Sequence, residues 1–389
     1  MINQILTPSR LFVGGKAVGK LGEVLSQLGS RRPLLVVDPT LLRLGVAQPV
    51  LDALESAGVA YGTFSEVVED PTDVSILAAA RVIREGDHDA VIGLGGGSAI
   101  DTAKAAAVVN ALGEDIRSFS VPRIVDHPVM PVIAIPTTAG TGSEVTRACV
   151  VSDAKSHEKL LILGTACLPA VAIVDYELTL SCPFRVTADT GIDALTHALE
   201  ALINRNRNPH ADALALSALK LIGANLLIVC KEPGNHAARE AMMLGATHAG
   251  LAVSNTSTAL VHGMSRPIGA FFHVPHGLSN AMLLPCVTEF SAAAAPEAFA
   301  AAARALGWAK ATDTDATAIH LLIDGFWEMN RTLEVPSPGE FGINREEYFS
   351  LRPEMARQAL QSGTPKNNPR VPTPDEIVAL YEQAWNRKG

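Results

Sequence analysis

The first half of the chain alternates short apolar runs with longer segments in which apolar residues recur at helical spacing. The apolar runs are closed by Gly, Pro or Asp, which is typical of buried parallel strands. Strands are predicted at Pro33–Pro39, Ala60–Phe64, Asp89–Leu94, Val132–Pro136 and Ala170–Asp175, and Leu11–Gly15 is interpreted as a strand or a loop entry. Helices are predicted at Ala17–Leu28, Pro49–Ala57, Thr72–Glu85 and Ala99–Leu112. This alternation indicates a parallel sheet covered by helices.

The pattern changes after Pro183. From there to about Ala303 the strand-like runs largely disappear, and long segments rich in Ala and Leu predict helices. Residues 311–372 mix polar and proline-rich stretches and support no ordered prediction. The helices predicted in this half include Ala211–Cys230, Ala237–Leu251, Ser291–Ala303 and Thr373–Trp385. We therefore predict an α/β domain at residues 1–184 and an all-α domain at residues 185–389.

Composition narrows the class of protein. The formal net charge is −9 and Lys and Arg form no block, so nucleic acid and an anionic membrane are disfavoured as partners. The five cysteines are scattered without a Cys-x-x-Cys, so we expect reduced thiols and no disulfide framework or zinc finger. Met1–Arg10 lacks the features of a signal peptide, and no uninterrupted apolar stretch reaches membrane-spanning length. These features favour a cytoplasmic protein.

A glycine-rich turn follows the predicted strand at Asp89–Leu94. Gly95, Gly96, Gly97 and Ser98 connect this strand to a helix. Glycine lets the backbone approach a pyrophosphate, and the free N–H groups and dipole of a helix start favour anions. The run is not a strict dinucleotide fingerprint, because Ser98 stands in place of the last glycine, and it is not a Walker A loop. A tight turn without a ligand is the alternative interpretation.

A second turn, Pro136–Glu144, also follows a predicted strand and is rich in hydroxyl groups. Turns at the carboxyl ends of parallel strands face one crevice, where open α/β sheets bind ligands. Asp38 ends an upstream strand and could accept hydrogen bonds from a ribose, although an ordinary Asp-Pro turn also explains it. A carboxylate there would repel a 2′-phosphate, which favours NAD over NADP. The candidate cofactor-binding residues of the second turn are Thr137, Thr138, Thr141 and Ser143.

Asp193 and His197 stand four residues apart in a segment with a helical pattern. At this spacing both side chains lie on one helical face, about 5–6 Å apart at Cβ. His262 and His276 each precede a glycine and would complete a four-ligand set. One carboxylate with three imidazoles suits Fe²⁺ or Zn²⁺ and not Ca²⁺ or Mg²⁺. The alternative is an Asp/His pair on a solvated helix face, since such pairs also occur without a metal.

Taken together, these motifs resemble the iron-containing (group III) alcohol dehydrogenase family. The resemblance extends over nearly the whole chain, up to Asn368–Arg370 and the last predicted helix. The matching segments are Gly95–Ser98, Pro136–Glu144, Val174–Asp175, Gly191–Glu200, His262–Met264 and Pro275–Gly277.

The resemblance implies an N-terminal dinucleotide-binding domain, a C-terminal helical domain and an active site in the cleft between them. It implies a divalent cation on the four candidate ligands and NAD(P) on the two turns, with Asp38 at the adenosine ribose. It also places Lys159, Leu178 and Leu180 along the cofactor. The implied reaction interconverts a primary alcohol, or an ω-hydroxy acid, and its aldehyde by hydride transfer, and the cation makes the alcohol easier to deprotonate. A homodimer or higher homo-oligomer is implied as well.

The sequence departs from the family pattern next to His262. Many members carry a second histidine four residues further on, a candidate for relaying the alcohol proton, and here that position is Arg266. Arginine stays charged at neutral pH and cannot relay a proton. His273 could substitute for it, or could only pack locally. Arg266 could pair with an acidic residue of the helical domain, or could bind a carboxylate on the substrate.

Three other functions are weaker alternatives. A cyclising lyase like dehydroquinate synthase is disfavoured because the metal-proximal motifs offer few basic residues for a phosphorylated substrate. A metal-free reductase like maleylacetate reductase is disfavoured because all four ligand positions are filled. The intact ligand set also argues against a non-catalytic nucleotide-binding protein.

Overall fold

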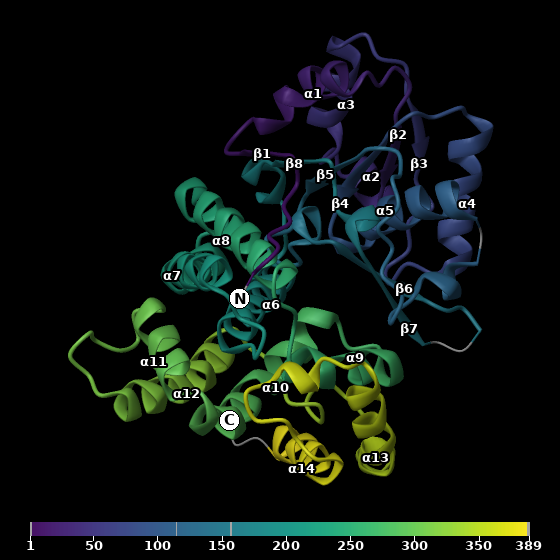
Figure 1. The fold of residues 1–389 in the computed structure, drawn as a ribbon. Helices are drawn as coiled ribbons and strands as arrows, with labels where there is room; N and C mark the ends of the chain where they lie inside the picture. Colours follow the sequence, from purple (N-terminus) through teal and green to yellow (C-terminus); the bar gives the residue numbers. More distant parts are fainter. Residues whose placement is uncertain (1, 114, 156–157, 387–389) are drawn as a thin grey trace. The chain divides into compact units, whose positions relative to one another are not determined.

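The computed structural model describes residues 2–113, 115–155 and 158–386. The chain divides into two compact units, one spanning Gln4–Cys182 and the other beginning at Pro183 (Figure 1). The first unit contains the parallel sheet and its covering helices, and the second unit is helical. The predicted fold class, α/β followed by all-α, is confirmed.

The first unit is built on a parallel sheet of six strands in the order β1-β8-β5-β4-β2-β3. Val, Leu and Ile fill its central strands, which are buried throughout, as expected for a sheet covered on both faces. The direction in which strands are added reverses between β2 and β4, which in open α/β sheets marks the ligand-binding point. The strands are β1 (Arg10–Val13), β2 (Leu34–Val37), β3 (Gly62–Phe64), β4 (Val91–Gly95), β5 (Val132–Pro136) and β8 (Val171–Val174).

Alternate residues of each strand face opposite layers of helices. Leu34 and Val36 pack in one core with residues of α4 and α5. Leu35 and Val37 pack in the other core with residues of α1 and α3, because successive side chains of a strand point to opposite faces. The helices are α1 (Leu21–Leu28), α2 (Pro39–Arg43), α3 (Gln48–Ser56), α4 (Asp73–Glu85) and α5 (Gly97–Leu112).

The structure adds an antiparallel hairpin that the hydrophobic pattern did not predict, β6 (Ala148–Ser152) paired with β7 (Lys159–Leu163). Both strands contain a continuous apolar run, Ala148–Val151 and Leu160–Leu163, yet only alternate residues are buried, as in a hairpin with one face on the core. The predicted helix Ala17–Leu28 begins with a 3₁₀ turn. The 3₁₀ helices of this unit are η1 (Ala17–Lys20), η2 (Ile116–Phe119), η3 (Ser143–Val145), η4 (Thr165–Cys167) and η5 (Tyr176–Thr179).

The second unit is organised around α6 (Phe184–Ile203). Every residue from Gly191 to Ile203 is buried, because α7, α8, α9, α10 and α11 all pack against this helix. The segment 311–372, for which the sequence supported no prediction, contains two of the helices, α12 and α13. The other helices are α7 (Pro209–Lys231), α8 (His236–Ser254), α9 (Leu260–Phe272), α10 (His276–Ser291), α11 (Pro296–Ala305), α12 (Asp315–Thr332), α13 (Arg345–Gln361) and α14 (Pro374–Trp385), with 3₁₀ turns η6 (Ala292–Ala294) and η7 (Pro365–Asn367).

One expected helix of this unit is interrupted. The Ala-rich stretch Ser291–Ala303 was expected to form a single helix, but α10 ends at Ser291 and a 3₁₀ turn follows. Helix α11 then begins at Pro296, a residue that suits the first helical position because its missing N–H would find no partner there.

Helix α7 is long and apolar, although polar residues interrupt it and the sequence has no uninterrupted apolar stretch of membrane-spanning length. By length and composition alone it could cross a membrane, and 33% of its most apolar window is buried in the unit. Ser217, Lys220 and Asn225 interrupt its apolar residues. The helix packs against α6, α8 and α11, as a core helix of a bundle does.

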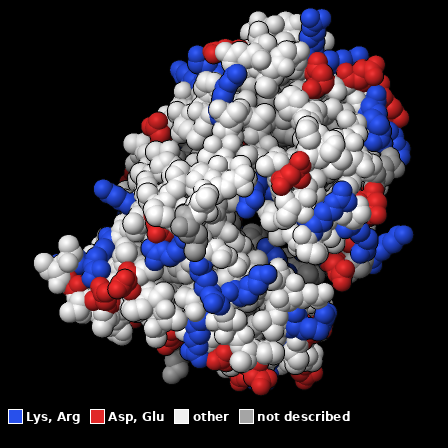
Figure 2. All heavy atoms as spheres, in the orientation of Figure 1, with Lys and Arg blue, Asp and Glu red and all other residues white. Residues whose placement is uncertain are grey.

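The thiols and charges agree with the expectations from composition. All five cysteines are free, and buried Cys149 and Cys167 lie with their sulfur atoms 3.6 Å apart. Figure 2 shows basic and acidic side chains interspersed on the face in view. This surface carries both signs of charge, in keeping with a sequence in which Lys and Arg form no block.

Candidate active site

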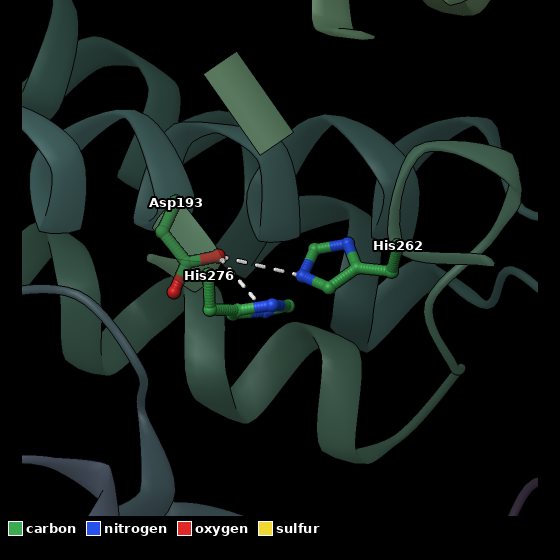
Figure 3. A group of neighbouring side chains, drawn as sticks. All are labelled: Asp193, His262 and His276. Carbon is green, nitrogen blue, oxygen red and sulfur yellow. Dashed lines mark ion pairs between the residues drawn. The ribbon is translucent and has the colours of Figure 1, made fainter. Parts of the chain in front are cut away.

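Asp193 and three imidazoles form a cluster within the helical unit. Figure 3 shows Asp193 with two of them, His262 and His276. α6 provides Asp193 and His197, α9 provides His262 near its start, and His276 is the first residue of α10. Potential ligand atoms of Asp193, His262 and His276 all lie within 4.8 Å of one another.

The distances place the Asp193 carboxylate at the centre of the cluster. Its Oδ1 lies 3.4 Å from His262 Nε2 and 3.7 Å from His276 Nε2, the two contacts dashed in Figure 3. His197 Nδ1 is 3.8 Å from the same oxygen, and its ring centroid is 4.4 Å from that of His262. The His262 side chain is 3% exposed, whereas that of His276 is 48% exposed. The four candidate ligands therefore come together, with three buried and one at the edge.

Glu200, two turns after Asp193 on α6, holds His262 from behind. Its carboxylate accepts a hydrogen bond from His262 Nδ1 at 2.7 Å. It also accepts hydrogen bonds from the backbone N–H groups of Ala259 and Val261, at 2.7 and 2.6 Å. With Nδ1–H bound to Glu200, the Nε2 atom of His262 is the nitrogen that faces Asp193. A carboxylate that orients a metal-binding histidine in this way is a common feature of metal sites.

The charges of the cluster shift its pKa values in opposite directions. Burial alone would raise the pKa of Asp193, but the surrounding imidazoles, His197 first, hold it well below its usual range. Burial alone would lower the pKa of His262, but Glu200 and Asp193 outweigh burial and raise it to about 9. Asp193 is therefore a carboxylate at neutral pH, a form that suits a cation.

The amide of Asn280 completes the cluster. Asn280 lies one turn after His276 on α10 and is fully buried. Its Nδ2 is 2.7 Å from Asp193 Oδ1, 3.2 Å from His262 Nε2 and 3.4 Å from His276 Nε2. Its Oδ1 is buried without a hydrogen-bond partner among the residues described. The amide nitrogen thus donates to Asp193 and lies beside the two ring nitrogens that would face a metal ion.

The glycine after His276 lets α10 approach α6 closely. A Cβ atom at Gly277 would lie 2.3 Å from the backbone oxygen of Asp189 and 2.7 Å from its carbonyl carbon. Because no side chain fits there, the first turn of α10 lies directly against α6. This contact brings His276 next to Asp193.

The two predicted cofactor turns lie side by side in the first unit. β4 and β5 are neighbouring parallel strands, and Gly95 is paired with Pro136 at their carboxyl ends. The backbone N–H of Thr137 donates to the carbonyl of Gly95 at 3.0 Å. A Cβ atom at Gly97 would lie 3.1 Å from Cγ2 of Thr141, so the turns are in contact. Both turns therefore end at the same edge of the sheet.

Asp38 lies at the same edge, at the end of β2. Its carboxylate caps α2 by accepting a hydrogen bond from Thr40 N–H at 2.6 Å. β2 and β4 flank the point where the strand order reverses. Asp38 and the glycine-rich turn therefore stand on either side of the usual ligand position of such sheets.

Other predicted cofactor residues have partners within the protein. Lys159 Nζ forms an ion pair with Asp70 at 2.7 Å. Leu178, in η5, packs in the core beneath α1 and α3, and Leu180 ends that 3₁₀ turn. Ser143 is buried, and its hydroxyl bonds to side chains of α5.

Arg266, the candidate for binding a substrate carboxylate, lies on α9. His273, the candidate for relaying the alcohol proton, lies at the end of the same helix. Arg266 is one turn after His262 and partly buried, and it forms no hydrogen bond or ion pair with any residue of the described chain. His273 ends α9 in the left-handed conformation, with φ of 54°, and is exposed.

Sequence analysis assigned no role to Glu200, Asn280, Asp101 or Lys104. The first two have a signal in spacing: Glu200 is three residues after a candidate ligand on α6, and Asn280 is four residues after one on α10. The signal for Lys104 is that it is the one basic residue of an Ala-rich helix, and Asp101 lies one turn before it.

The first unit has a parallel sheet of the kind that binds nucleotides, and the helical unit has a buried cluster of a carboxylate and imidazoles. These two features together define a dehydrogenase of two units. The family model "Iron-containing alcohol dehydrogenase" matches residues 8–176. The model "Fe-containing alcohol dehydrogenase family, C-terminal" matches residues 187–385. The chain belongs to the iron-containing alcohol dehydrogenase family, and it is an oxidoreductase that interconverts alcohols and aldehydes.

Known relatives match along the whole chain. Lactaldehyde reductase of Escherichia coli (strain K12) is 34% identical over 388 residues, with 99% of this chain and 100% of the relative covered. NAD-dependent methanol dehydrogenase of Bacillus methanolicus is 34% identical, with 99% and 100% covered. The crystal structure of 1,3-propanediol oxidoreductase has a TM-score of 0.95 at 33% identity, covering 99% of this chain and 100% of that chain. The family resemblance inferred from the motifs is confirmed.

Proposed function

We propose that the chain is an NAD-dependent dehydrogenase of a small primary alcohol or aldehyde and that Asp193, His197, His262 and His276 bind Fe²⁺ or Zn²⁺. The observation that carries the proposal is the convergence of a carboxylate oxygen and two imidazole nitrogens within 4.8 Å inside a buried cluster. A homologous enzyme named as NAD-dependent supports the choice of cofactor.

The residues present fit a divalent transition metal. Imidazole and carboxylate donors suit Fe²⁺ and Zn²⁺. Glu200 fixes the ring of His262 with Nε2 toward Asp193, and the Asn280 amide donates to Asp193 Oδ1 and lies 3.2 Å from His262 Nε2. When bound, the cation supplies Lewis acidity toward an alcohol or carbonyl oxygen, and the nicotinamide supplies the hydride acceptor or donor.

The first unit offers a place for the cofactor. α5 begins after Gly96 without a side-chain cap, so the first N–H groups of this helix are available to a pyrophosphate. Asp38 stands across the reversal point, where a carboxylate suits a ribose hydroxyl and repels the 2′-phosphate of NADP. Thr137, Thr138 and Thr141 belong to the adjoining turn. We therefore expect NAD in preference to NADP.

Metal analysis and a spectrophotometric assay test this proposal. Purified protein is analysed for metal and assayed for NADH formation or consumption with short alcohols, diols, ω-hydroxy acids and their aldehydes. We expect bound Fe or Zn, loss of activity with a chelator, and recovery after Fe²⁺ or Zn²⁺ is added. Protein that lacks metal and shows no turnover after both cations are supplied would refute the proposal.

Arg266 favours a substrate that carries a carboxylate. Burial lowers the pKa of Arg266, although the charge of nearby Glu200 acts in the opposite direction. Glu200 already accepts three hydrogen bonds, and no hydrogen bond or ion pair joins it to Arg266 among the described residues. A partly buried guanidinium beside the cluster is therefore ready to bind an anionic group in a bidentate manner.

Replacing Arg266 tests the substrate class separately from the reaction. We expect Arg266→Met to raise KM for an ω-hydroxy acid or its semialdehyde about tenfold or more, because a charge-assisted pair with the substrate carboxylate is lost. KM for a neutral alcohol should change less than twofold. An equal loss for acidic and neutral substrates would exclude the carboxylate role while leaving the dehydrogenase intact.

The proposal includes a homodimer or higher homo-oligomer in the cytoplasm. Sedimentation of the purified enzyme measures the first, and fractionation of expressing cells measures the second. A monomer at working concentration would refute the proposed oligomer, and protein recovered outside the cytoplasm would refute the proposed location. Neither result would affect the proposed reaction.

A further inference from the structure

The two helices α9 and α10, which each bring one histidine into the cluster, both contain a proline in their interior. His262 lies near the start of α9, and Pro267 follows it within the same helix. His276 begins α10, and Pro285 lies further along that helix. Proline has no backbone N–H, so the carbonyl four residues earlier loses its helical partner and the helix bends there. In both helices the proline therefore weakens the connection between the turn that carries the histidine and the rest of the helix.

Asn330 of α12 supplies the hydrogen bond that Pro285 removes. The carbonyl left without a helical partner by this proline is that of Ala281, four residues earlier. Asn330 Nδ2 donates to this oxygen at 2.7 Å. Asn330 is fully buried, and its amide oxygen has no hydrogen-bond partner within the described part of the chain. Burying an amide costs free energy unless it is hydrogen-bonded, so the bond to Ala281 is what offsets the burial of this side chain.

Tyr381 of α14 acts in a similar way on α9. Its side chain is fully buried, and its hydroxyl donates to the backbone oxygen of Met264 at 2.7 Å. Met264 lies three residues before Pro267, in the turn that the proline interrupts. It is also midway between His262 and Arg266. The bond from Tyr381 therefore holds the turn that carries both a candidate metal ligand and the arginine beside the cluster.

We propose that Asn330 and Tyr381 are positioning residues for the metal, because each fixes a turn that presents a histidine to Asp193 and that a proline interrupts. Both act through the backbone, since their hydrogen bonds go to carbonyl oxygens and not to candidate ligands. The inference rests on the proposed metal site. A metal site needs its ligands held close to the productive geometry, so a turn that is free to shift binds the ion less tightly.

A purely structural role is the competing explanation, since a hydrogen bond to a buried carbonyl stabilises any fold. The two explanations differ in what the loss of the bond does to the folded protein. Loss of a merely stabilising bond lowers the unfolding temperature and leaves the Kd for metal unchanged. Loss of a positioning bond also raises the Kd for metal, because the histidine then samples other positions.

Tyr381→Phe removes only the hydroxyl, and Tyr348→Phe is its matched control. Tyr348 is also fully buried, and its hydroxyl donates to the backbone oxygen of Tyr381 at 3.0 Å. Each variant thus loses one buried hydrogen bond to a carbonyl, but the bond from Tyr348 joins α13 to α14 and not to a helix that carries a ligand. Chelator-treated protein is titrated with Zn²⁺ in competition with a metallochromic chelator. Thermal unfolding of each variant is recorded alongside.

Asn330→Leu tests the same role on α10, and Pro285→Ala offers a rescue. In the double variant, residue 285 regains an N–H for the Ala281 carbonyl, so the bond from Asn330 is no longer needed. We expect Asn330→Leu to raise the Kd for Zn²⁺ about tenfold and the double variant to return to within about threefold of the unaltered protein. The rescue separates the loss of one backbone bond from a general loss of packing.

We expect Tyr381→Phe to raise the Kd for Zn²⁺ about fivefold or more, and Tyr348→Phe to leave it within about twofold, although both lower the unfolding temperature. If Asn330→Leu does not fold, the two tyrosine variants decide alone. Equal Kd values in the tyrosine variants, or a loss in Asn330→Leu that Pro285→Ala does not restore, would overturn the inference. Unaltered protein that binds no Zn²⁺ would instead remove the proposed metal site, a distinct result.

Discussion

Glu200 accepts three hydrogen bonds beside the cluster. Its carboxylate accepts from the ring of His262 and from two backbone N–H groups at the start of α9. One side chain therefore sets both the orientation of a candidate ligand and the position of the helix that carries it. Replacing a residue that holds a metal ligand in this way typically weakens metal affinity 10–100-fold, which is roughly 1.4–2.7 kcal/mol of binding free energy.

Glu200→Gln is expected to weaken Zn²⁺ binding about 10–100-fold, because an amide offers one acceptor oxygen where the carboxylate offers two and removes the charge beside His262. Competition with a metallochromic chelator measures the Kd. Glu297→Gln, an exposed change on α11, is the control and should leave the Kd unchanged. Equal affinity in the two variants would show that Glu200 serves the fold and not the metal.

His273→Asn tests the proposed proton relay. Asparagine tolerates the left-handed conformation at the end of α9, so the helix end is retained while the titratable group is lost. If His273 relays the alcohol proton, kcat falls about 100-fold and the pH–rate profile loses one limb. An unchanged profile would assign His273 to local packing, in line with its exposed position.

At the scale of elements, the cluster depends on where α10 begins relative to α6. Asp193 and His276 lie on different helices, and Gly277 lets their backbones meet. A change at this contact therefore acts on the metal through the helix and not through a ligand.

Gly277→Ala is expected to destabilise the helical unit by about 1–3 kcal/mol, because the added methyl group would overlap the carbonyl of Asp189. It should also weaken Zn²⁺ binding by shifting His276. Urea unfolding and metal titration measure the two effects. Gly234→Ala, at a glycine with no atom near the added methyl, should show neither. A stable Gly277→Ala variant with normal metal affinity would contradict the close approach.

Asp89 joins the starts of β2 and β4 in the first unit. Its carboxylate accepts from Ser30 Oγ at 2.6 Å and from the N–H groups of Arg31 and Arg32 at 2.7 and 3.1 Å. Partial burial raises the pKa of Asp89, but these hydrogen bonds outweigh burial and lower it below its ordinary value of 3.8. Because the pKa is lower in the folded state, the stabilisation is present above pH 3.8 and is lost as the pH falls through the folded-state pKa.

Asp89→Asn is therefore expected to lower the free energy of unfolding at pH 7 by about 1 kcal/mol, a modest value because solvent screens this exposed group. The difference from the original protein should shrink as the pH falls below about 4. Urea unfolding at several pH values measures it. Asp87→Asn, two residues away, is the control, and a difference that does not vary with pH would contradict the assignment.

Elements with strong local patterns were predictable, and those that depend on distant partners were not. The central strands, such as Val132–Pro136, are apolar throughout and flanked by breakers, so their type follows from sequence. The β6–β7 hairpin is an exception, because its strands carry apolar runs in sequence and no strand was predicted there. Asp193 and His197 were predictable because one helix presents both. The roles of Glu200 and Lys104 depend on which segments the fold brings to them, and spacing alone contains no such information.

At the scale of the whole molecule, the proposed metal site and the proposed cofactor site belong to different units. The metal ligands lie in α6, α9 and α10, and the cofactor turns follow β4 and β5. Each ligand therefore stabilises its own unit through binding, by about 4 kcal/mol at a free concentration of 1,000 times its Kd.

Hydrogen exchange should resolve these two effects. Adding Zn²⁺ to chelator-treated protein is expected to protect amides of α6 and of the first turns of α9 and α10. Adding NADH is expected to protect the turns after β4 and β5 and the first turn of α5, because binding suppresses local opening. Mass spectrometry of peptic peptides measures the pattern. Protection by Zn²⁺ confined to the first unit would refute the proposed metal ligands.

Helix α9 has no cap of its own, since Ala259 precedes it and offers no side-chain acceptor. Its opening N–H groups instead bind a carboxylate that lies 59 and 61 residues earlier in the chain. A designer who transplants the carboxylate and three imidazoles onto another helical scaffold would therefore copy an incomplete part. The set to transfer is the four ligands together with Glu200, because a side chain of α6 caps the start of α9.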